Sequence, residues 1–291
     1  MIHRKTQMTE QRIFVIDSQG LNAAQLCPER YNLSLVQYKQ RASKETYLDE
    51  GAIMHHMFQC YYTLIKYRDR WSRNNFDLSK AVEVALKVGE YFTTKATSEV
   101  DWEELSRVFK EYTTFYKDDY PDIVAVEAAV AKVLYEDEDL KIIYQGKIDL
   151  VEYHPQLSRL PWDHKTMRKR SSGAPDLSNQ FKGYCWLLGV NDLRVNRVGF
   201  QTSLKPNEKF SRPIISYPNE IIEEWVKDTT YWAKMMIFYQ DSGYYPHNLT
   251  SCDKYNGCPY KEICISIPAA RRYKLDRDFV DVPIWDVGGV L

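Results

Sequence analysis

The chain has 291 residues, of which 44% are hydrophobic, and its 39 basic and 40 acidic side chains leave a net charge of −1. This balance excludes a protein that coats nucleic acid through bulk positive charge, and no apolar run approaches the length of a membrane span. The length allows one large domain or two small ones. Residues Met1–Gln11 are polar and lack the apolar core of a secretory leader, so we expect a cytoplasmic protein without a membrane partner.

The first part of the chain is predicted to be helical, because apolar residues recur there at helical spacing. Cys27 lies within the first of these segments and His55 within the second. The last segment carries an apolar stripe that begins at Trp102, which we attribute to core packing. The predicted helices span Ser18–Tyr38, Glu50–Tyr67, Leu78–Lys95 and Val100–Lys117.

After residue 120 the pattern changes to β-type runs, which are interrupted by a helix over Ser178–Gly189 and followed by a long helix. The long helix begins at its cap, Asn219, and ends at Gly243. The first two strands are predicted to form a hairpin. The predicted strands span Ile123–Tyr135, Lys141–Tyr153, Leu160–Thr166, Arg194–Leu204 and Arg212–Tyr217. This order predicts an α/β fold with a mixed β-sheet flanked by helices.

Two aspartates and a lysine lie on neighbouring predicted strands. Asp149 stands in an apolar run, and Asp163 and Lys165 follow on the next strand. Residues two apart on a strand face the same side, so Asp163 and Lys165 point together. Aspartate oxygens are hard ligands suited to Mg²⁺ or Mn²⁺, and a lysine can stabilise charge that develops on a phosphate. From these residues alone, two solvated aspartates at strand ends are an equally good interpretation.

Further short motifs accompany this group. Gly51 and His55 form Gly-x-x-x-His, Asp149 ends Gly-x-x-Asp, and Gln180 and Tyr184 lie one turn apart on a predicted helix. Together with Asp-x-Lys, and in this order, these motifs resemble the RecB-type branch of the PD-(D/E)XK nuclease superfamily. The resemblance implies a restriction-endonuclease-like core.

The resemblance also implies roles for individual residues. His55, Asp149 and Asp163 would be metal ligands, and the carbonyl of His164 would be a further one. Glu127 matches a position that is often acidic in such nucleases. The catalytic lysine would be Lys165, and the DNA-positioning residues would be Gln180 and Tyr184.

Four of the six cysteines form a second signal. Cys252, Cys258 and Cys264 are arranged as C-x5-C-x5-C, and thiolates at short loop spacing bind iron–sulfur clusters or zinc. A tetrahedral site needs a fourth ligand, for which Cys27 is the best candidate. A disulfide framework is the alternative, although a reducing cytoplasm disfavours it. Cys60 and Cys185 lie in apolar surroundings and are interpreted as small buried residues.

Iron–sulfur nucleases of the RecB type carry one cysteine near the N-terminus and three near the C-terminus, where they commonly form C-x2-C-x5-C. The second spacing matches this chain, whereas the first is longer here. The resemblance therefore implies a [4Fe–4S] cluster, with zinc as the alternative, held by Cys27, Cys252, Cys258 and Cys264.

The resemblance also divides the chain into four segments. Residues 1–42 would hold the first helix with Cys27, residues 43–119 a helical cap, residues 120–217 the nuclease core, and residues 218–291 the last helix, the cysteine cluster and a tail.

The function implied is a Mg²⁺- or Mn²⁺-dependent DNA exonuclease acting on single-stranded ends, in a bacterial, archaeal or phage-infected cell. It would be similar to the exonucleases of CRISPR spacer acquisition and to the nuclease domain of AddB. Its partners would be recombination, replication or CRISPR-adaptation proteins, and any helicase would be a separate chain because no G-x-x-x-x-G-K-[ST] loop occurs. Arg168–Arg170 would contact phosphates. The alternative is a catalytically weak module that binds DNA ends for a recombination or integration partner.

Overall fold

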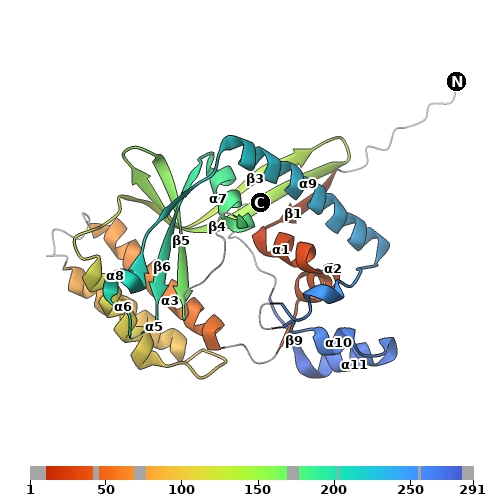
Figure 1. The fold of residues 1–291 in the computed structure, drawn as a ribbon, viewed down its shortest axis with the longest axis horizontal. Coiled ribbons are helices and arrows are strands. Elements are labelled where there is room, and N and C mark those ends of the chain that lie inside the picture. Colours follow the sequence, from red (N-terminus) through yellow and green to blue (C-terminus); the bar gives the residue numbers. More distant parts are fainter. Residues whose placement is uncertain are drawn as a thin grey trace. The chain divides into compact units, whose positions relative to one another are not determined.

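A computed structural model describes residues 11–41, 46–68, 77–168, 177–201, 203–254 and 257–283. Its centre is a seven-stranded sheet in the order β1-β4-β5-β6-β7, in which β3 also pairs with β4 and β8 with β6 (Figure 1). The strands are β1 (Arg12–Ile16), β3 (Ile123–Glu136), β4 (Leu140–His154), β5 (Ser158–Met167), β6 (Asp192–Gly199), β7 (Phe210–Ser211) and β8 (Ile214–Ser216).

The sheet is mixed, as the sequence predicts. The pairs β1–β4 and β5–β6 are parallel, whereas β4–β5, β6–β7 and β6–β8 are antiparallel. The predicted pairing of the first two long strands is confirmed, because β3 pairs with β4. The strand predicted over Arg194–Leu204 begins earlier and ends at Gly199, where the main chain of Lys209 approaches so closely that a Cβ would lie 3.2 Å from its carbonyl oxygen.

The chain folds into two compact units, which share the long strands β3 and β4. Unit 1 comprises Met1–Gln40, Val130–Gly146 and Glu220–Leu291, and unit 2 comprises Arg41–Ala129 and Lys147–Asn219. All the residues that the sequence assigns to the nuclease centre belong to unit 2, and the four candidate cluster cysteines belong to unit 1.

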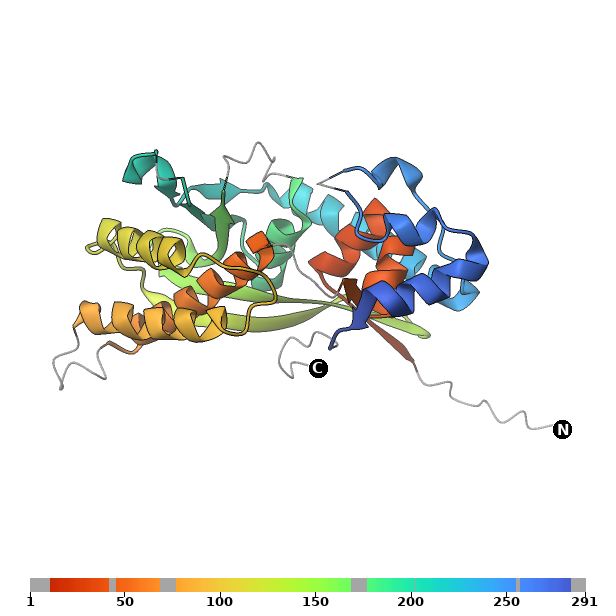
Figure 2. The same cartoon turned by 90° about the horizontal axis from the view of Figure 1, so that it is seen from below.

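Unit 2 packs helices around β5 and β6. Its helices are α3 (Thr46–Lys66), α5 (Leu78–Thr93), α6 (Trp102–Phe115), α7 (Asn179–Leu188) and the short α8 (Pro206–Lys209). Helix α3 contacts β5, α5 and α6, and α7 contacts β5 and β6 (Figure 2). Side-chain caps from Asp77, Asp101 and Ser178 begin α5, α6 and α7. The core is aromatic, and its fully buried members include Phe58, Tyr62, Phe109, Tyr112 and Trp162.

Two glycines allow close approach within unit 2. A Cβ at Gly51 would lie 3.4 Å from the hydroxyl of Thr166, so the start of α3 lies directly against β5. A Cβ at Gly89 would lie 2.5 Å from the sulfur of Met57 and 2.8 Å from the ring of Trp102. Only glycine fits at residue 89 without displacing its neighbours.

Unit 1 is built from shorter pieces around one long helix. Its helices are α1 (Ser18–Leu26), α2 (Pro28–Tyr31), a π-helical turn (Asn32–Val36), α9 (Asn219–Ser242), a 3₁₀ turn (Leu249–Ser251), α10 (Lys261–Cys264) and α11 (Pro268–Asp278). Strands β2 (Lys39–Arg41) and β9 (Phe279–Asp281) pair in a small separate sheet. No helix within the described residues is long and apolar enough to cross a bilayer.

The first predicted helix, Ser18–Tyr38, is interrupted at Cys27. Cys27 is extended, with φ −166° and ψ 116°, and it separates α1 from α2. Proline disfavours helical backbone in the residue before it and is well suited to the first helical position, so Pro28 explains both the end of α1 and the start of α2. The break turns Cys27 out of the helical pattern and makes it the cap between two helices.

Candidate active site

Two carboxylates meet where the ladder between β4 and β5 ends. The last antiparallel pair in that direction is Leu150 with Trp162, and the next positions along the two strands are Asp149 and Asp163. In place of a further ladder bond, the main-chain N–H of His164 donates to Asp149 Oδ2 at 2.7 Å. Asp163 is 1% exposed, and the side chain of Asp149 is 13% exposed. The two strands therefore separate at Asp149 and Asp163. We call this pair of residues and the side chains around it the acidic junction.

Lys165 reaches Asp163 from two positions along the same strand. Its Nζ donates to Asp163 Oδ1 at 3.1 Å and lies 3.0 Å from Oδ2, which accepts no hydrogen bond. The buried Oδ2 thus keeps a lone pair available to a cation. Asp163 and Lys165 face the same side of β5, as the alternation of strand residues predicts.

The Gln-x-x-x-Tyr motif links Lys165 to the main chain of β4. Lys165 Nζ donates to Gln180 Oε1 at 3.0 Å, Gln180 Nε2 donates to the Tyr184 hydroxyl at 2.9 Å, and that hydroxyl donates to the carbonyl of Lys147 at 2.7 Å. Tyr184 is 5% exposed. The two motif residues are brought to the predicted centre, where they hold the lysine by a chain of hydrogen bonds.

His55 and Glu127 complete the group on the other side of Asp149. His55 Nδ1 lies 3.6 Å from Asp149 Oδ1, and ligand atoms of His55, Glu127 and Asp149 all lie within 4.8 Å of one another. The adjacent His56 instead stacks on Phe92, with ring centroids 3.7 Å apart. The structure therefore selects His55 as the histidine that faces the carboxylates.

Glu127 owes its direction to an unusual backbone. Its φ is +51°, a left-handed conformation that is uncommon for a residue other than glycine and costly within a strand. This conformation interrupts the alternation of β3, and Glu127 Oε2 forms an ion pair with Lys147 Nζ at 2.6 Å. Strain of this kind persists where the surrounding structure holds it and is frequent at functional sites.

The surroundings shift the pKa values of the two aspartates in opposite directions. Burial raises the pKa of Asp163, and the nearby Asp149 adds to this effect, which exceeds the opposing influence of Lys165. Burial acts in the same direction on Asp149, but the hydrogen bond and positive charge of His55 outweigh it, so the pKa of Asp149 is lowered. Burial acts to lower the pKa of Lys165, but Asp163 reverses the shift and raises it. Burial lowers the pKa of the His164 ring to about 3, which keeps the ring neutral.

Arg168, predicted to contact phosphates, is engaged by carboxylates. It forms a bidentate pair with Glu50 and a 2.9 Å pair with Glu104, joining the end of β5 to α3 and α6. Sequence reasoning missed this role because Glu50 and Glu104 are distant along the chain. The other two residues of that basic stretch, Lys169 and Arg170, lie outside the described residues.

The candidate cluster cysteines come together within unit 1. The N–H of Asn248 donates to Cys27 Sγ at 3.3 Å, and the N–H of Cys258 donates to the carbonyl of Cys252 at 2.7 Å. Burial raises the pKa of the Cys264 thiol to about 12, and nearby Glu29 and the other three thiols add to the shift. All six cysteines are free thiols, and Cys185 is fully buried.

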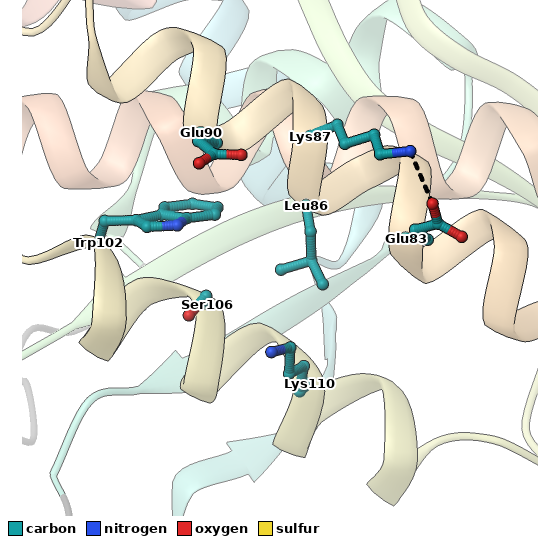
Figure 3. Close-up of a pocket in the computed structure, with 7 residues that line it drawn as sticks. All are labelled: Glu83, Leu86, Lys87, Glu90, Trp102, Ser106 and Lys110. Carbon is teal, nitrogen blue, oxygen red and sulfur yellow. Dashed lines mark hydrogen bonds and ion pairs between the residues drawn. The ribbon is translucent and has the colours of Figure 1, made fainter.

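A shallow pocket on the helical part of unit 2 has no part in this group. It lies between α5 and α6 and is lined by Glu83, Leu86, Lys87, Glu90, Trp102, Ser106 and Lys110 (Figure 3). Its charged side chains project along the two helices, and Lys87 pairs with Glu83 at 2.6 Å. None of the residues at the acidic junction lines it.

The family model for the PD-(D/E)XK nuclease superfamily matches residues 18–265, which is most of the chain. The chain belongs to this superfamily. The mixed sheet flanked by helices is accordingly a restriction-endonuclease-like PD-(D/E)XK fold. In this superfamily divalent metals support cleavage of DNA, which agrees with the group formed by His55, Glu127 and Asp149.

Two solved structures are similar to this PD-(D/E)XK chain. One is described as a "putative exonuclease" from Eubacterium rectale; at 11% identity it covers 82% of this chain and 86% of its own, with a TM-score of 0.50. The other, SSO0001, has 13% identity and covers 73% of this chain and 84% of its own, with a TM-score of 0.37. At these identities the likeness concerns the fold alone. No curated protein matches the chain.

Proposed function

We propose that this chain is a Mg²⁺- or Mn²⁺-dependent deoxyribonuclease of the iron–sulfur RecB-like type, acting as an exonuclease on single-stranded DNA ends. The observation that carries the proposal is the acidic junction, where Asp149 and Asp163 face each other beside the Lys165 ammonium. A protein that only binds DNA ends has no need to bury two opposed carboxylates there, because removing charged groups from water is costly even when they are paired.

The residues at the junction fit a divalent cation. Asp149, Asp163 and Glu127 offer carboxylate oxygens, His55 offers an imidazole nitrogen and His164 a main-chain carbonyl, a donor set suited to Mg²⁺ or Mn²⁺. Asp163 Oδ2 is buried and lies 3.0 Å from the Lys165 ammonium, and a carboxylate oxygen with two lone pairs could be shared between that ammonium and a metal ion. When bound, the metal would lower the pKa of water and neutralise charge on the phosphate.

The chain's own residues would then position the DNA and stabilise the charge of the transition state. Lys165, held by Asp163 and Gln180, would place its ammonium beside the scissile phosphate and stabilise the negative charge of the transition state. We propose that Gln180 and Tyr184 position the DNA strand and also hold Lys165 through their hydrogen bonds. The 44% exposure of the Lys165 side chain leaves it accessible to a substrate.

We propose that Cys27, Cys252, Cys258 and Cys264 bind a [4Fe–4S] cluster that ties the first helices to the C-terminal segment. Zinc is the alternative occupant, since four thiolates can hold either centre. The cluster would have a structural role, because metal binding by distant ligands stabilises the folded chain.

The function is tested with protein purified without oxygen and three end-labelled or circular substrates. With Mn²⁺ we expect release of label from linear single strands, slower release from duplex, and none from circular single strands. Ca²⁺ should support little cleavage, because it binds loosely and acidifies water weakly. Asp163→Asn, prepared in parallel, is the control for contaminating nuclease.

Three results would each contradict part of the proposal. Equal Mn²⁺-dependent cleavage by wild-type protein and Asp163→Asn would remove the junction from the chemistry. Tight binding of DNA ends without any cleavage would instead support a module that serves a recombination, replication or CRISPR-adaptation partner. Cleavage of circular single strands would keep the nuclease and reject the exonuclease.

A further inference from the structure

His164 connects the acidic junction to the core. Its main-chain N–H holds Asp149 Oδ2, and it stands between Asp163 and Lys165 on β5. Because strand residues alternate, its ring points to the opposite face, where it is 3% exposed. There it packs against α3, with ring centroids 4.7 Å from Phe58 and 5.5 Å from Tyr62. The ring also lies edge-on to His55, with centroids 5.9 Å apart, so His164 links the junction to the core through both its main chain and its side chain.

A buried amide holds that ring. Asn196 is the direct neighbour of His164 across the parallel ladder between β5 and β6, and it is completely buried. Its Nδ2 lies 2.9 Å from His164 Nδ1, and its Oδ1 accepts a 3.0 Å hydrogen bond from the Tyr112 hydroxyl. A polar side chain is costly to bury unless its hydrogen bonds are made, and both ends of this amide are used.

The orientation of the Asn196 amide, whose Oδ1 faces the Tyr112 hydroxyl, sets the directions of the hydrogen bonds in this network. A guanidinium only donates, and Arg212 Nη2 lies 2.9 Å from the Tyr112 hydroxyl and 3.1 Å from the Tyr62 hydroxyl. Tyr112 gives its single hydrogen to Asn196, so in the 2.5 Å contact between the hydroxyls Tyr62 donates. Asn196 must then donate from Nδ2, which leaves His164 Nδ1 as an acceptor and places the ring hydrogen on Nε2.

Arg212, at the far end of this hydrogen-bond network, is held by a ring contact and an ion pair. The Arg212 guanidinium carbon lies 3.4 Å from the ring centroid of Tyr116, and Nη1 donates to a carboxylate oxygen of Asp119 at 3.0 Å. The Arg212 side chain is 6% exposed. The guanidinium at one end and the imidazole at the other thus hold the two tyrosine hydroxyls and the Asn196 amide between them.

We propose that Asn196 and Tyr112 are positioning residues of the nuclease centre, acting through the ring of His164 on the main chain that holds Asp149, Asp163 and Lys165. This inference rests on the proposed nuclease function. Rotation of the His164 peptide would move its N–H away from Asp149 and shift both neighbouring side chains. The hydrogen bonds of the His164 ring would thereby determine where Asp149, Asp163 and Lys165 stand in the nuclease centre.

The test compares variants that differ in the network but match in packing. Asn196→Leu removes both hydrogen bonds of the amide, and Tyr112→Phe removes only the hydroxyl. Tyr116→Phe is the control for the second, because Tyr116 contacts the same guanidinium while its hydroxyl is no part of this chain. Val198→Ala is the control for the first, since Val198 is fully buried on the same strand and its truncation destabilises without touching the network.

The readouts are Mn²⁺ affinity by calorimetry and the kcat and KM for single-stranded DNA. We expect Asn196→Leu to lose about tenfold in Mn²⁺ affinity and in kcat, because residues that orient ligands typically have effects of this size. KM should stay within twofold. Tyr112→Phe should show a smaller loss in the same two quantities, and both control variants should stay within twofold of wild type. Asn196→Leu that matches Val198→Ala in every readout would overturn the proposal.

A magnetic resonance measurement without metal or DNA separates this inference from the proposed function. In wild-type protein the His164 ring should carry its hydrogen on Nε2, and its main-chain N–H should exchange slowly. In Asn196→Leu the ring should populate both tautomers and the N–H should exchange at least tenfold faster than in Val198→Ala. Absence of Mn²⁺-dependent cleavage in wild type would reject the nuclease function alone. Unchanged exchange and tautomer in Asn196→Leu would reject the positioning role whatever the activity.

Discussion

The acidic junction and the four candidate cluster cysteines lie beside hydrophobic cores of very different size. The acidic junction of unit 2 lies beside a large aromatic cluster in which Phe58, Tyr62, Phe109 and Trp162 are almost completely buried. The cysteines of unit 1 lie beside a small cluster made by Leu33, Tyr260, Ile263, Leu275 and Phe279, against which Cys258 packs. A large core orders polar groups before any ligand arrives, whereas a small one needs additional links.

The hydrogen bonds around the two groups show the same difference. Lys165, Gln180 and Tyr184 hold one another through side chains, and Asn196 holds His164. Around the cysteines, the main-chain N–H groups of Asn248 and Cys258 fix the loops. The nuclease centre should therefore be ordered without metal, and the cysteine segment should gain most of its order from the centre that it binds.

The largest effect that we predict is on activity. Lys165→Ala should reduce cleavage about 100-fold or more, because it removes an electrostatic stabiliser of the transition state. Its melting temperature should change little, since the large core is untouched. Single-turnover cleavage with Mn²⁺ measures the first quantity and calorimetry the second. Lys182→Ala, on the same helix as Gln180, is the matched control, and a nearly active Lys165→Ala enzyme would contradict the assignment.

The second prediction concerns the proposed cysteine site of unit 1. Cys27→Ala should abolish the visible absorbance and the bound iron and sulfide, because three thiolates from one segment cannot replace the fourth. Limited proteolysis should then cut both the first helices and the C-terminal segment several-fold faster. Cys185→Ala is the control, since that thiol is buried in unit 2. Loss of colour in the Cys185 variant, or full retention in the Cys27 variant, would refute the four-cysteine site.

The third prediction addresses the core of unit 2. Phe109→Ala should cost about 3–5 kcal/mol of unfolding free energy, the usual result of removing a large buried ring. Denaturant unfolding followed by tryptophan fluorescence measures this loss. Iron content at low denaturant should remain that of wild type, because Phe109 belongs to the other unit. If iron were lost together with the aromatic core, the two regions would not be energetically separate.

The smallest effect is expected from Gly89→Ala. The added methyl would overlap Met57 and Trp102, and overpacking of this kind costs about 1–3 kcal/mol. Met57→Ala should relieve part of this cost in the double variant, so the two changes should be non-additive. Strictly additive free energies in the same denaturant experiment would show that α5 shifts to make room.

Much of the fold follows from local pattern. The long strands β3, β4 and β5 and helices α5, α6 and α7 were predictable because their apolar residues recur at the period of the element. The prediction of one helix over Ser18–Tyr38 was wrong at Cys27, although the following Pro28 is a local signal for the break. Strand β1 was missed because it is a single short run beside a polar stretch, and its partner β4 lies far along the chain.

The candidate site was predictable where short motifs carry it. Strand alternation placed Asp163 and Lys165 on one side, the resemblance to RecB-type nucleases implied the roles of His55, Asp149, Asp163 and Lys165, and the structure brings the four together. Asn196 was not identified, because its role depends on the register between β5 and β6. The strand around it also contains Asp192, Arg194 and Arg197, so nothing in the sequence marks Asn196 as a buried residue. The left-handed backbone of Glu127 was also invisible, since tertiary contacts impose it.

The division of unit 1 along the chain has a consequence for biosynthesis. Unit 2 is complete at Asn219, whereas unit 1 needs residues from both ends of the chain. At ~5–20 residues per second, a ribosome needs roughly 10–50 s to proceed from Cys27 to Cys264. During this interval the Cys27 thiol is exposed to oxidants and to competing metals while its partners do not yet exist. The proposed cysteine site can therefore assemble only after Cys264 has been synthesised, and oxygen during expression should harm it more than oxygen applied to the finished protein.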